Sequence, residues 1–211
     1  MLADAIVGAA VERASAGVIY AEPKRPEAQL VRALYRELAA DERVGTPRTE
    51  CGFLLPGWTR PPGGVDLSAG FTDGGSCVIE AKVGKPEEAI WDIIKLADIL
   101  ALDVTVTAAY LIYDATSKTW AKTDRATSLF TESEQLRSVR ELIESSRQDW
   151  DWLLKGGRGI RPITCVAAVR ITHIGSRDLP AHEGHELRVL RVAPDVSSDL
   201  QRFDMEGWPS D

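Results

Sequence analysis

The sequence predicts an α/β or α+β fold in which helices flank a mixed central β-sheet. Segments with apolar residues at helical spacing alternate with segments that have the alternating polarity of strands. The 211 residues are 44% apolar and 27% charged, which suits a chain that buries a core of its own. Because no internal repeat or low-complexity segment breaks the pattern, we expect one domain over residues 1–211.

Two helices are expected first. Residues 1–20 are apolar enough to raise the question of a signal peptide, but no basic residue precedes the apolar run, and Asp4 and Glu12 interrupt it. We therefore predict a helix that packs on the core. A second helix begins at Pro26, which the first turn of a helix tolerates, and leucines and alanines then form one apolar face. A short strand is expected over residues 50–55.

A β-hairpin is predicted next, with "VDLSAGF" and "CVIEAKV" as its strands and "TDGGS" as its turn. The stretch "PEEAIWDIIKLADILAL" has isoleucines and alanines at helical spacing, which predicts a helix. The apolar stretch "VTVTAAYLIYDA" then predicts a long strand.

The last third of the chain is expected to hold one more helix and two strands. Leu136, Val139 and Leu142 recur at helical spacing and predict a helix over residues 132–154. The alternating stretches "PITCVAAVRITHI" and "ELRVLRVAP" predict strands, linked by the polar loop "GSRDLPAHEGH".

The bulk composition limits the function classes. A formal net charge of -7 and a pI near 5.1 provide no basic surplus for long-range attraction to nucleic acid, so such binding needs a local basic patch. Cys51, Cys77 and Cys165 are odd in number and lack a CxxC pair, so reduced thiols are expected. The apolar runs fall short of the roughly 20 residues that span a bilayer. We expect a cytoplasmic protein with no membrane partner.

The predicted hairpin contains the charged residues that suggest a chemical function. Because side chains alternate along a strand, Glu80 and Lys82 share one face, while Ile79 and Ala81 belong to the opposite, core face. A turn centred on Asp73-Gly74-Gly75 would place Asp66 opposite Lys82 and diagonal to Glu80, within contact range. We therefore expect Asp66, Glu80 and Lys82 on one face of the hairpin.

This set of side chains suits a divalent metal. Two neighbouring carboxylates repel each other unless a cation lies between them. Mg²⁺ prefers oxygen ligands, keeps several waters and takes one or two protein carboxylates, and the carbonyl of Ala81 could add a further oxygen. A bound metal would polarise a phosphodiester and activate water, while Lys82 orients that water or stabilises developing negative charge. The pattern indicates hydrolysis of a phosphodiester.

These residues resemble the core of the PD-(D/E)xK nuclease superfamily, which has the restriction-endonuclease-like fold. In that family an Asp on one strand and a Glu-x-Lys on the next form the metal site, as "VDLSAG" and "VIEAKV" would here. The family also places a Glu in the helix before the hairpin, and Glu27 matches that position, with Glu37 as the alternative. One departure is Val65, which stands where the family commonly has Pro.

The resemblance covers about residues 20–115, which follow the family's α, β, β, β, α, β order; residues 116–211 would add a C-terminal helix and β-hairpin. It implies a Mg²⁺- or Mn²⁺-dependent phosphodiesterase, a nuclease with DNA as its expected substrate. A homodimer would supply one such site for each strand of a duplex.

The resemblance also implies a role for each site residue. Asp66 and Glu80 would hold the metal together with the backbone carbonyl of Ala81. Lys82 would be the catalytic lysine. Glu27 would be an accessory ligand or an acid that positions water.

Three other interpretations stay open. The superfamily includes inactive members, so the chain could be a non-catalytic binding or regulatory protein that acts as a partner in a larger assembly. The charged trio could instead form a salt bridge on a solvent-exposed strand. The match could also be accidental in a small α/β enzyme of another kind.

A few basic residues are candidates for contacts with nucleic acid. Lys95 either faces a phosphate backbone or forms an exposed intrahelical pair with Asp92. Arg158 and Arg161 lie in "KGGRGIR", where glycines would let backbone amides approach an anion, although the stretch also fits a solvated turn. The chain contains no recognisable reader module for a specific base sequence.

The stretch "HEGHE" raises the question of a second metal site. His182 and His185 are three residues apart in a glycine-containing loop, but no third ligand stands at a recognised spacing. A polar hairpin loop is the simpler interpretation.

Overall fold

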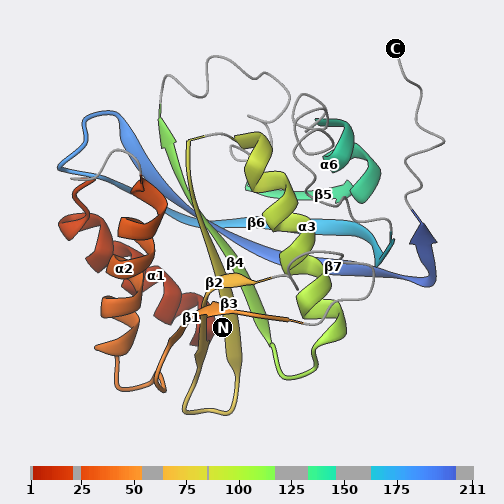
Figure 1. Ribbon diagram of the computed structural model, residues 1–211, viewed down its shortest axis with the longest axis horizontal. Coiled ribbons are helices and arrows are strands. Elements are labelled where there is room, and N and C mark those ends of the chain that lie inside the picture. Colours follow the sequence, from red (N-terminus) through yellow and green to blue (C-terminus); the bar gives the residue numbers. More distant parts are fainter. Residues whose placement is uncertain are drawn as a thin grey trace.

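A mixed β-sheet forms the centre of the molecule (Figure 1). The computed structural model describes residues 2–20, 25–53, 64–84, 86–116, 133–145 and 163–202. In chain order the elements are α1 (Leu2–Gly17), α2 (Pro26–Ala39), β1 (Arg48–Cys51), β2 (Val65–Gly70), β3 (Ser76–Val83), α3 (Pro86–Leu102), β4 (Ala108–Thr116), β5 (Glu134–Ser138), α6 (Val139–Ser145), β6 (Ile163–Asp178) and β7 (His185–Arg202).

The described residues form one seven-stranded sheet with the order β1-β2-β3-β4-β7-β6-β5. Only β3 and β4 run parallel within it, and α3 makes the crossover that a parallel pair requires. The C-terminal hairpin of β6 and β7 continues the same sheet, because β7 pairs with β4. The predicted α+β class with a mixed sheet is confirmed.

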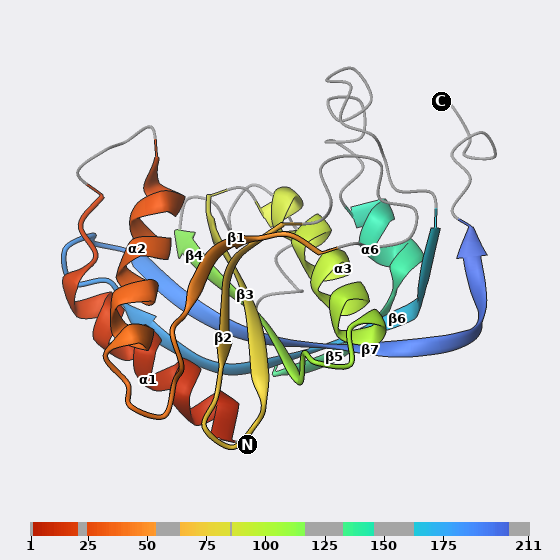
Figure 2. The ribbon, with the colours of Figure 1, turned by 60° about the horizontal axis from the view of Figure 1, so that its bottom comes forward.

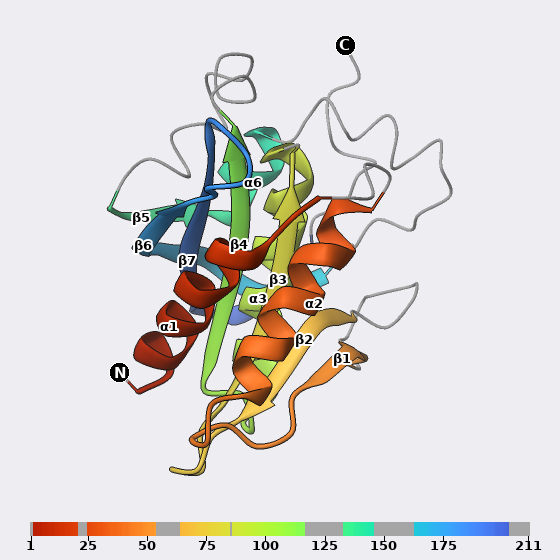
Figure 3. The same cartoon turned by 90° about the vertical axis from the view of Figure 1, so that its left-hand side faces the viewer.

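Helices cover both faces of the sheet. The two N-terminal helices pack on one face, with α1 against β6 and β7 and α2 against β2 and β3 (Figure 3). On the other face α3 lies across β3, β4, β6 and β7, with α6 beside it (Figures 1 and 2). The central strands are therefore buried on both sides, as a sheet covered by two helical layers requires.

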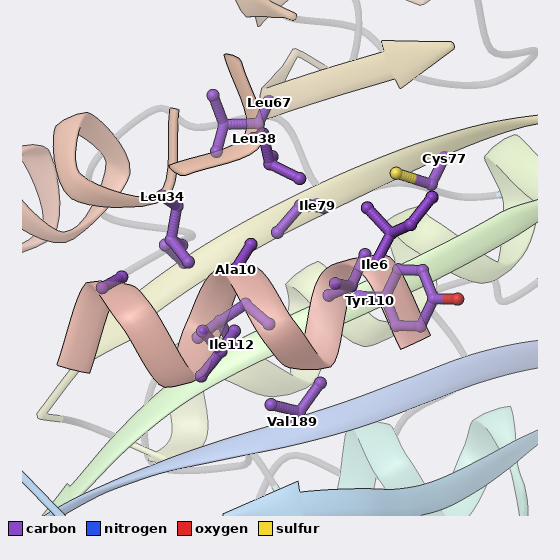
Figure 4. Close-up of a cluster of buried hydrophobic side chains, with 14 of the residues drawn as sticks. Ile6, Ala10, Leu34, Leu38, Leu67, Cys77, Ile79, Tyr110, Ile112 and Val189 are labelled. Carbon is purple, nitrogen blue, oxygen red and sulfur yellow. The ribbon is translucent and has the colours of Figure 1, made fainter. Parts of the chain in front are cut away.

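The layer beneath α1 and α2 is an apolar core. Ile6 from α1 and Leu34 from α2 meet Ile79 and Ile112 of the sheet, and all are 1% exposed or less (Figure 4). The apolar stripe that predicts α2 supplies this contact, because its buried members recur at helical spacing. Both N-terminal helices that the sequence predicts are confirmed.

The β2–β3 turn comes one residue earlier than expected. The Phe71 N–H donates to the Gly75 carbonyl (2.7 Å), so Thr72, Asp73 and Gly74 form the turn. Gly74 has φ +89°, which glycine adopts without strain, and Asp73 Oδ1 accepts the Gly75 N–H (3.0 Å). A three-residue hairpin loop with glycine in the left-handed position explains the difference.

The earlier turn shifts the pairing register by two residues. Leu67 pairs with Ile79, and continuing this register places Asp66 across from Glu80. The expected position of Asp66, opposite Lys82, is therefore wrong. The two carboxyl groups are brought closer together than the sequence analysis placed them.

The helix expected over residues 132–154 begins with a strand instead. Residues 134–138 form β5 against β6, and Leu136 is 51% exposed rather than part of an apolar helical face. Helix α6 starts only after Ser138, whose hydroxyl accepts the Glu141 N–H while the Glu141 carboxylate accepts the Ser138 N–H. This capping box, "SVRE", marks the helix start in the sequence. Residues 146–154 lie outside the described residues.

Two smaller expectations differ at their boundaries. The strand expected over residues 50–55 is β1, which ends at Cys51, and residues 54–55 lie outside the described residues. The loop between the last two strands is shorter than predicted, because β6 continues to Asp178. Among the described helices, none is long and apolar enough to cross a membrane.

The central place of β4 can be tested with a core substitution. Ile112 is fully buried, and Ile112→Ala should lower the free energy of unfolding by about 2–5 kcal/mol, because it removes apolar contacts and leaves a cavity. Urea denaturation measures this loss. Val104 is 95% exposed, so the control Val104→Ala should change stability by less than about 0.5 kcal/mol. Equal losses would contradict this core.

Candidate functional site

A cluster of acidic and basic side chains lies along β3, between α3 and the start of α2, and it contains all the predicted site residues whose positions are described. Strand β2 contributes Asp66, β3 contributes Glu80 and Lys82, and the first turn of α2 contributes Glu27. Val78 and Leu111, which face α3, belong to the apolar core around the cluster. The solvent-exposed strand that stayed open as an alternative is ruled out, because Glu80 is only 5% exposed.

Asp66 is oriented by the backbone of the neighbouring strand. Its Oδ2 accepts the Ala81 N–H at 2.8 Å, just past the Leu67–Ile79 pair. Within a strand the N–H and C=O of one residue point to the same side, so the Ala81 carbonyl also points toward β2. The structure therefore brings the Asp66 carboxylate and the Ala81 carbonyl to the same side of β3.

Glu80 is the buried acid of the cluster. Its carboxyl group lies against the Lys95 ammonium of α3. Burial, together with the charges of Asp92 and Asp66, raises the pKa of Glu80 to about 9, while Lys95 acts in the opposite direction. Glu80 is thus a carboxyl group that holds its proton at neutral pH until a stronger cationic partner arrives.

Lys82 bridges two acids from different elements. Its Nζ lies 3.5 Å from Glu27 Oε1 and 3.6 Å from Asp92 Oδ2. The side chain is 17% exposed, so it lies between the buried part of the cluster and the solvent. A lysine held in this way presents a fixed positive charge at the entrance of the site.

Glu27 closes the exposed side of the cluster. Its Oε1 also receives the Val83 N–H at a long 3.5 Å, and its side chain is 41% exposed. Partial burial raises the pKa of Glu27, with a further contribution from Asp66, while Lys82 and the Val83 N–H lower it. The choice of Glu27 over Glu37 is supported, because Glu37 instead pairs with Arg13 and Arg36.

The sequence analysis missed the part that α3 contributes to the site. Asp92 and Lys95 do form an i,i+3 pair (3.2 Å), but they are largely buried, so the expected exposed pair is wrong. The same burial places Lys95 against Glu80, where it cannot reach a phosphate backbone on the surface. The available signal was a charged pair among the isoleucines and leucines of a largely apolar helix.

Lys95 stays charged in this environment. Burial disfavours the ammonium, but Asp92 and Glu80 outweigh that effect and raise the pKa of Lys95. It therefore serves as the internal counter-ion of the two acids. The contacts with Asp92 and Glu80 also explain how a lysine is tolerated on the buried side of α3.

The charges of the cluster do not balance. Its members are the carboxyl groups of Glu27, Asp66, Glu80 and Asp92 and the ammonium groups of Lys82 and Lys95. With all of them ionised, negative charge exceeds positive charge, and the raised pKa values of Glu80 and Glu27 follow from burial together with this excess. A divalent cation is the kind of ligand that such an arrangement favours.

The oxygen donors fit Mg²⁺ or Mn²⁺ better than a metal that needs a full protein cage. No three His, Cys, Asp or Glu side chains among the described residues converge on one metal position. Asp66, Glu80 and the Ala81 carbonyl would supply part of a coordination shell, and Mg²⁺ characteristically completes its shell with waters and substrate oxygens.

The remaining expectations concern residues away from this cluster. Arg158 and Arg161 lie outside the described residues. His182 lies in the turn between β6 and β7 and contacts Tyr20, while His185 begins β7 and contacts Asp114. The turn is thus the polar loop that the sequence favoured, tied to the rest of the fold.

Comparisons of the chain with protein-family models, with curated protein sequences and with solved structures give no match. The arrangement of the cluster is therefore the evidence on which a function must be argued.

The buried state of Glu80 predicts a pH-dependent stability. Between about pH 4.3, where an unfolded Glu titrates, and pH 9, the native protein holds a proton that the unfolded chain has lost. Stability should therefore fall as pH rises, by at most about 1.4 kcal/mol per pH unit. Glu80→Gln should remove this dependence, so its stability relative to the parent should increase from pH 5 to pH 9 in urea denaturation.

Glu134→Gln is the matched control, because Glu134 forms an ion pair at the surface. Its stability relative to the parent should change little over the same range. A Glu80→Gln difference that is equal at pH 5 and pH 9 would contradict the buried, protonated carboxyl.

Proposed function

We propose that this protein is a metal-dependent phosphodiesterase, a nuclease of the PD-(D/E)xK type, with DNA as its substrate. The observation that carries the proposal is that Asp66, Glu80, Lys82 and Glu27 lie in one cluster although they come from three separate elements. The order α2, β1, β2, β3, α3, β4 supports the restriction-endonuclease-like fold that this proposal includes.

In this proposal Asp66, Glu80 and the Ala81 carbonyl hold Mg²⁺ or Mn²⁺. The bound metal supplies a Lewis acid that polarises the phosphodiester and lowers the pKa of water. Asp66 is already oriented for this role by the Ala81 N–H. Glu80 gives up its proton on metal binding, as a ligand with a raised pKa must.

Lys82 and Glu27 act on the side of the cluster that solvent reaches. The ammonium of Lys82 stabilises negative charge that develops on the phosphate or orients the attacking water. Glu27 fixes the Lys82 side chain and positions water beside it. Asp92 holds Lys82 from the opposite side, so the lysine is kept in place by acids of two helices.

Substrate binding requires a local patch, because the chain as a whole is acidic. A homodimer would bring two sites to the two strands of a duplex. Cleavage is best measured on single-stranded DNA, double-stranded DNA and RNA, because the cluster does not distinguish between these substrates.

One observation favours the alternative of a non-catalytic binding protein on the same scaffold. Lys95 already occupies the place beside Glu80 where a cation would bind, so the cluster could serve as a buried ion-pair network. Calorimetric titration with Mg²⁺ and Mn²⁺ separates the two functions. No metal binding, together with no cleavage of DNA or RNA, would support the binding protein.

Substitution of site residues tests catalysis directly. Lys82→Met and Asp66→Asn should each lower the rate of cleavage with Mg²⁺ or Mn²⁺ by about 10²-fold or more, since each removes charge from the reacting groups. Cleavage of plasmid, single-stranded DNA and RNA is the measurement. Asp195→Asn, an exposed substitution on β7, should cleave like the parent. A folded Lys82→Met variant that cleaves at the parental rate would contradict the proposed nuclease function.

Lys95 offers a separate test of the metal site. Metal binding at Glu80 replaces a proton with a divalent cation. The Lys95 ammonium repels the divalent cation about twice as strongly as it repels the proton. Lys95→Met should therefore tighten Mn²⁺ binding, roughly tenfold. Calorimetry measures the affinity, and circular dichroism verifies the fold. Unchanged or weaker binding in a folded variant would be evidence against a metal at Glu80.

A further inference from the structure

A second polar cluster lies on the face of the sheet that α1 and α2 cover. Asp114 at the end of β4 is fully buried and shares this face with Tyr110 and Ile112. The Tyr20 hydroxyl donates to Asp114 Oδ2 at 2.6 Å, and His185 Nδ1 lies 3.1 Å from both carboxylate oxygens. The buried carboxylate therefore has two polar partners from distant parts of the chain.

The His182 side chain binds the backbone of Tyr20. The Tyr20 N–H donates to His182 Nε2 at 3.0 Å, and the two rings stack with centroids 4.6 Å apart. The rings of His182 and His185 are 5.5 Å apart. Tyr20 is thus fixed at both its main chain and its side chain.

This cluster lies next to the candidate active site along the sheet. Asp114 is the ladder partner of Val83, and the Val83 N–H donates to Glu27. Asp114 and Glu27 are therefore linked through Val83, at the neighbouring ends of β3 and β4.

We propose that Tyr20, Asp114, His182 and His185 form a pH-sensitive clasp that positions Glu27 against Lys82. His182 can accept the Tyr20 N–H only while its Nε2 carries no proton. Imidazoles gain a proton between about pH 8 and pH 5. Protonation turns this acceptor into a second donor, which opposes the Tyr20 N–H and loosens the clasp.

The titratable groups around His182 come from three elements. Tyr20 approaches from the end of α1, His185 from the start of β7 and Asp114 from β4, while Glu183 is its exposed chain neighbour. Burial and the Asp114 carboxylate raise the pKa of Tyr20, so its hydroxyl remains a donor throughout this range.

The effect of the clasp on cleavage rests on the proposed nuclease function, but its structural part does not. The amide signals of Tyr20 and Val83 in ¹H–¹⁵N NMR spectra report the two hydrogen bonds directly. Between pH 8 and pH 5 both signals should shift with the same midpoint. A Val83 signal that does not follow Tyr20 would overturn the coupling.

His182→Gln provides the decisive variant, because a glutamine oxygen can accept the Tyr20 N–H but does not titrate. Both amide titrations should be lost in this variant, while His173→Gln, on β6, should behave like the parent. If Val83 still titrates in His182→Gln, then Glu27 itself drives the shift and the proposal is wrong.

Tyr20→Phe tests the clasp without any titration. Loss of the hydroxyl bond to Asp114 should give Val83, already at pH 8, the signal position that the parent reaches at pH 5. The control Tyr35→Phe on α2 should leave Val83 unchanged. An unchanged Val83 signal in Tyr20→Phe would contradict the clasp. Coupled titration in a parent protein that cleaves no nucleic acid would support the clasp and reject the nuclease function.

Discussion

The contact between the Glu80 carboxyl group and the Lys95 ammonium, buried between β3 and α3, is the interaction on which the site depends. Removing charged groups from water is expensive, and the surrounding groups must compensate for it. Asp92 provides a second partner for Lys95, and Asp66 adds a negative charge near Glu80. Burial and the resulting excess of carboxyl groups raise the pKa of Glu80 and keep it protonated at neutral pH. A divalent cation would relieve that excess, which makes the cluster a candidate metal centre.

The topology explains how these groups meet. The parallel pair β3–β4 requires a crossover, so α3 is placed over the strand that carries Glu80 and Lys82. The three-residue turn at Gly74 sets the register that brings Asp66 next to Glu80. On the opposite face, the Asp114 cluster holds Tyr20, which follows α1, and α2 brings Glu27 to Lys82. Both helical layers of the sheet therefore contribute to one site.

The sequence alone predicted the parts of the site that depend on local periodicity. A strand period of two placed Glu80 and Lys82 on one face, and the helix that starts at Pro26 placed Glu27 in its first turn. The register of Asp66 could not be predicted, because it depends on which glycine takes the left-handed position. The role of Lys95 was hidden, since burial of a helix face depends on what packs against it. Tyr20 and Asp114 are 94 residues apart, and no local pattern links them.

In the proposed function, the excess of carboxyl groups beside Lys82 binds a divalent metal for phosphodiester cleavage. Crystals soaked in Mn²⁺ and measured at an anomalous wavelength test it most directly. We expect an anomalous peak about 2.0–2.4 Å from oxygens of both Asp66 and Glu80, with the Lys95 ammonium moved away from Glu80. Absence of a peak, with Lys95 still paired to Glu80 at saturating Mn²⁺, would contradict the account and identify the cluster as a buried ion-pair network.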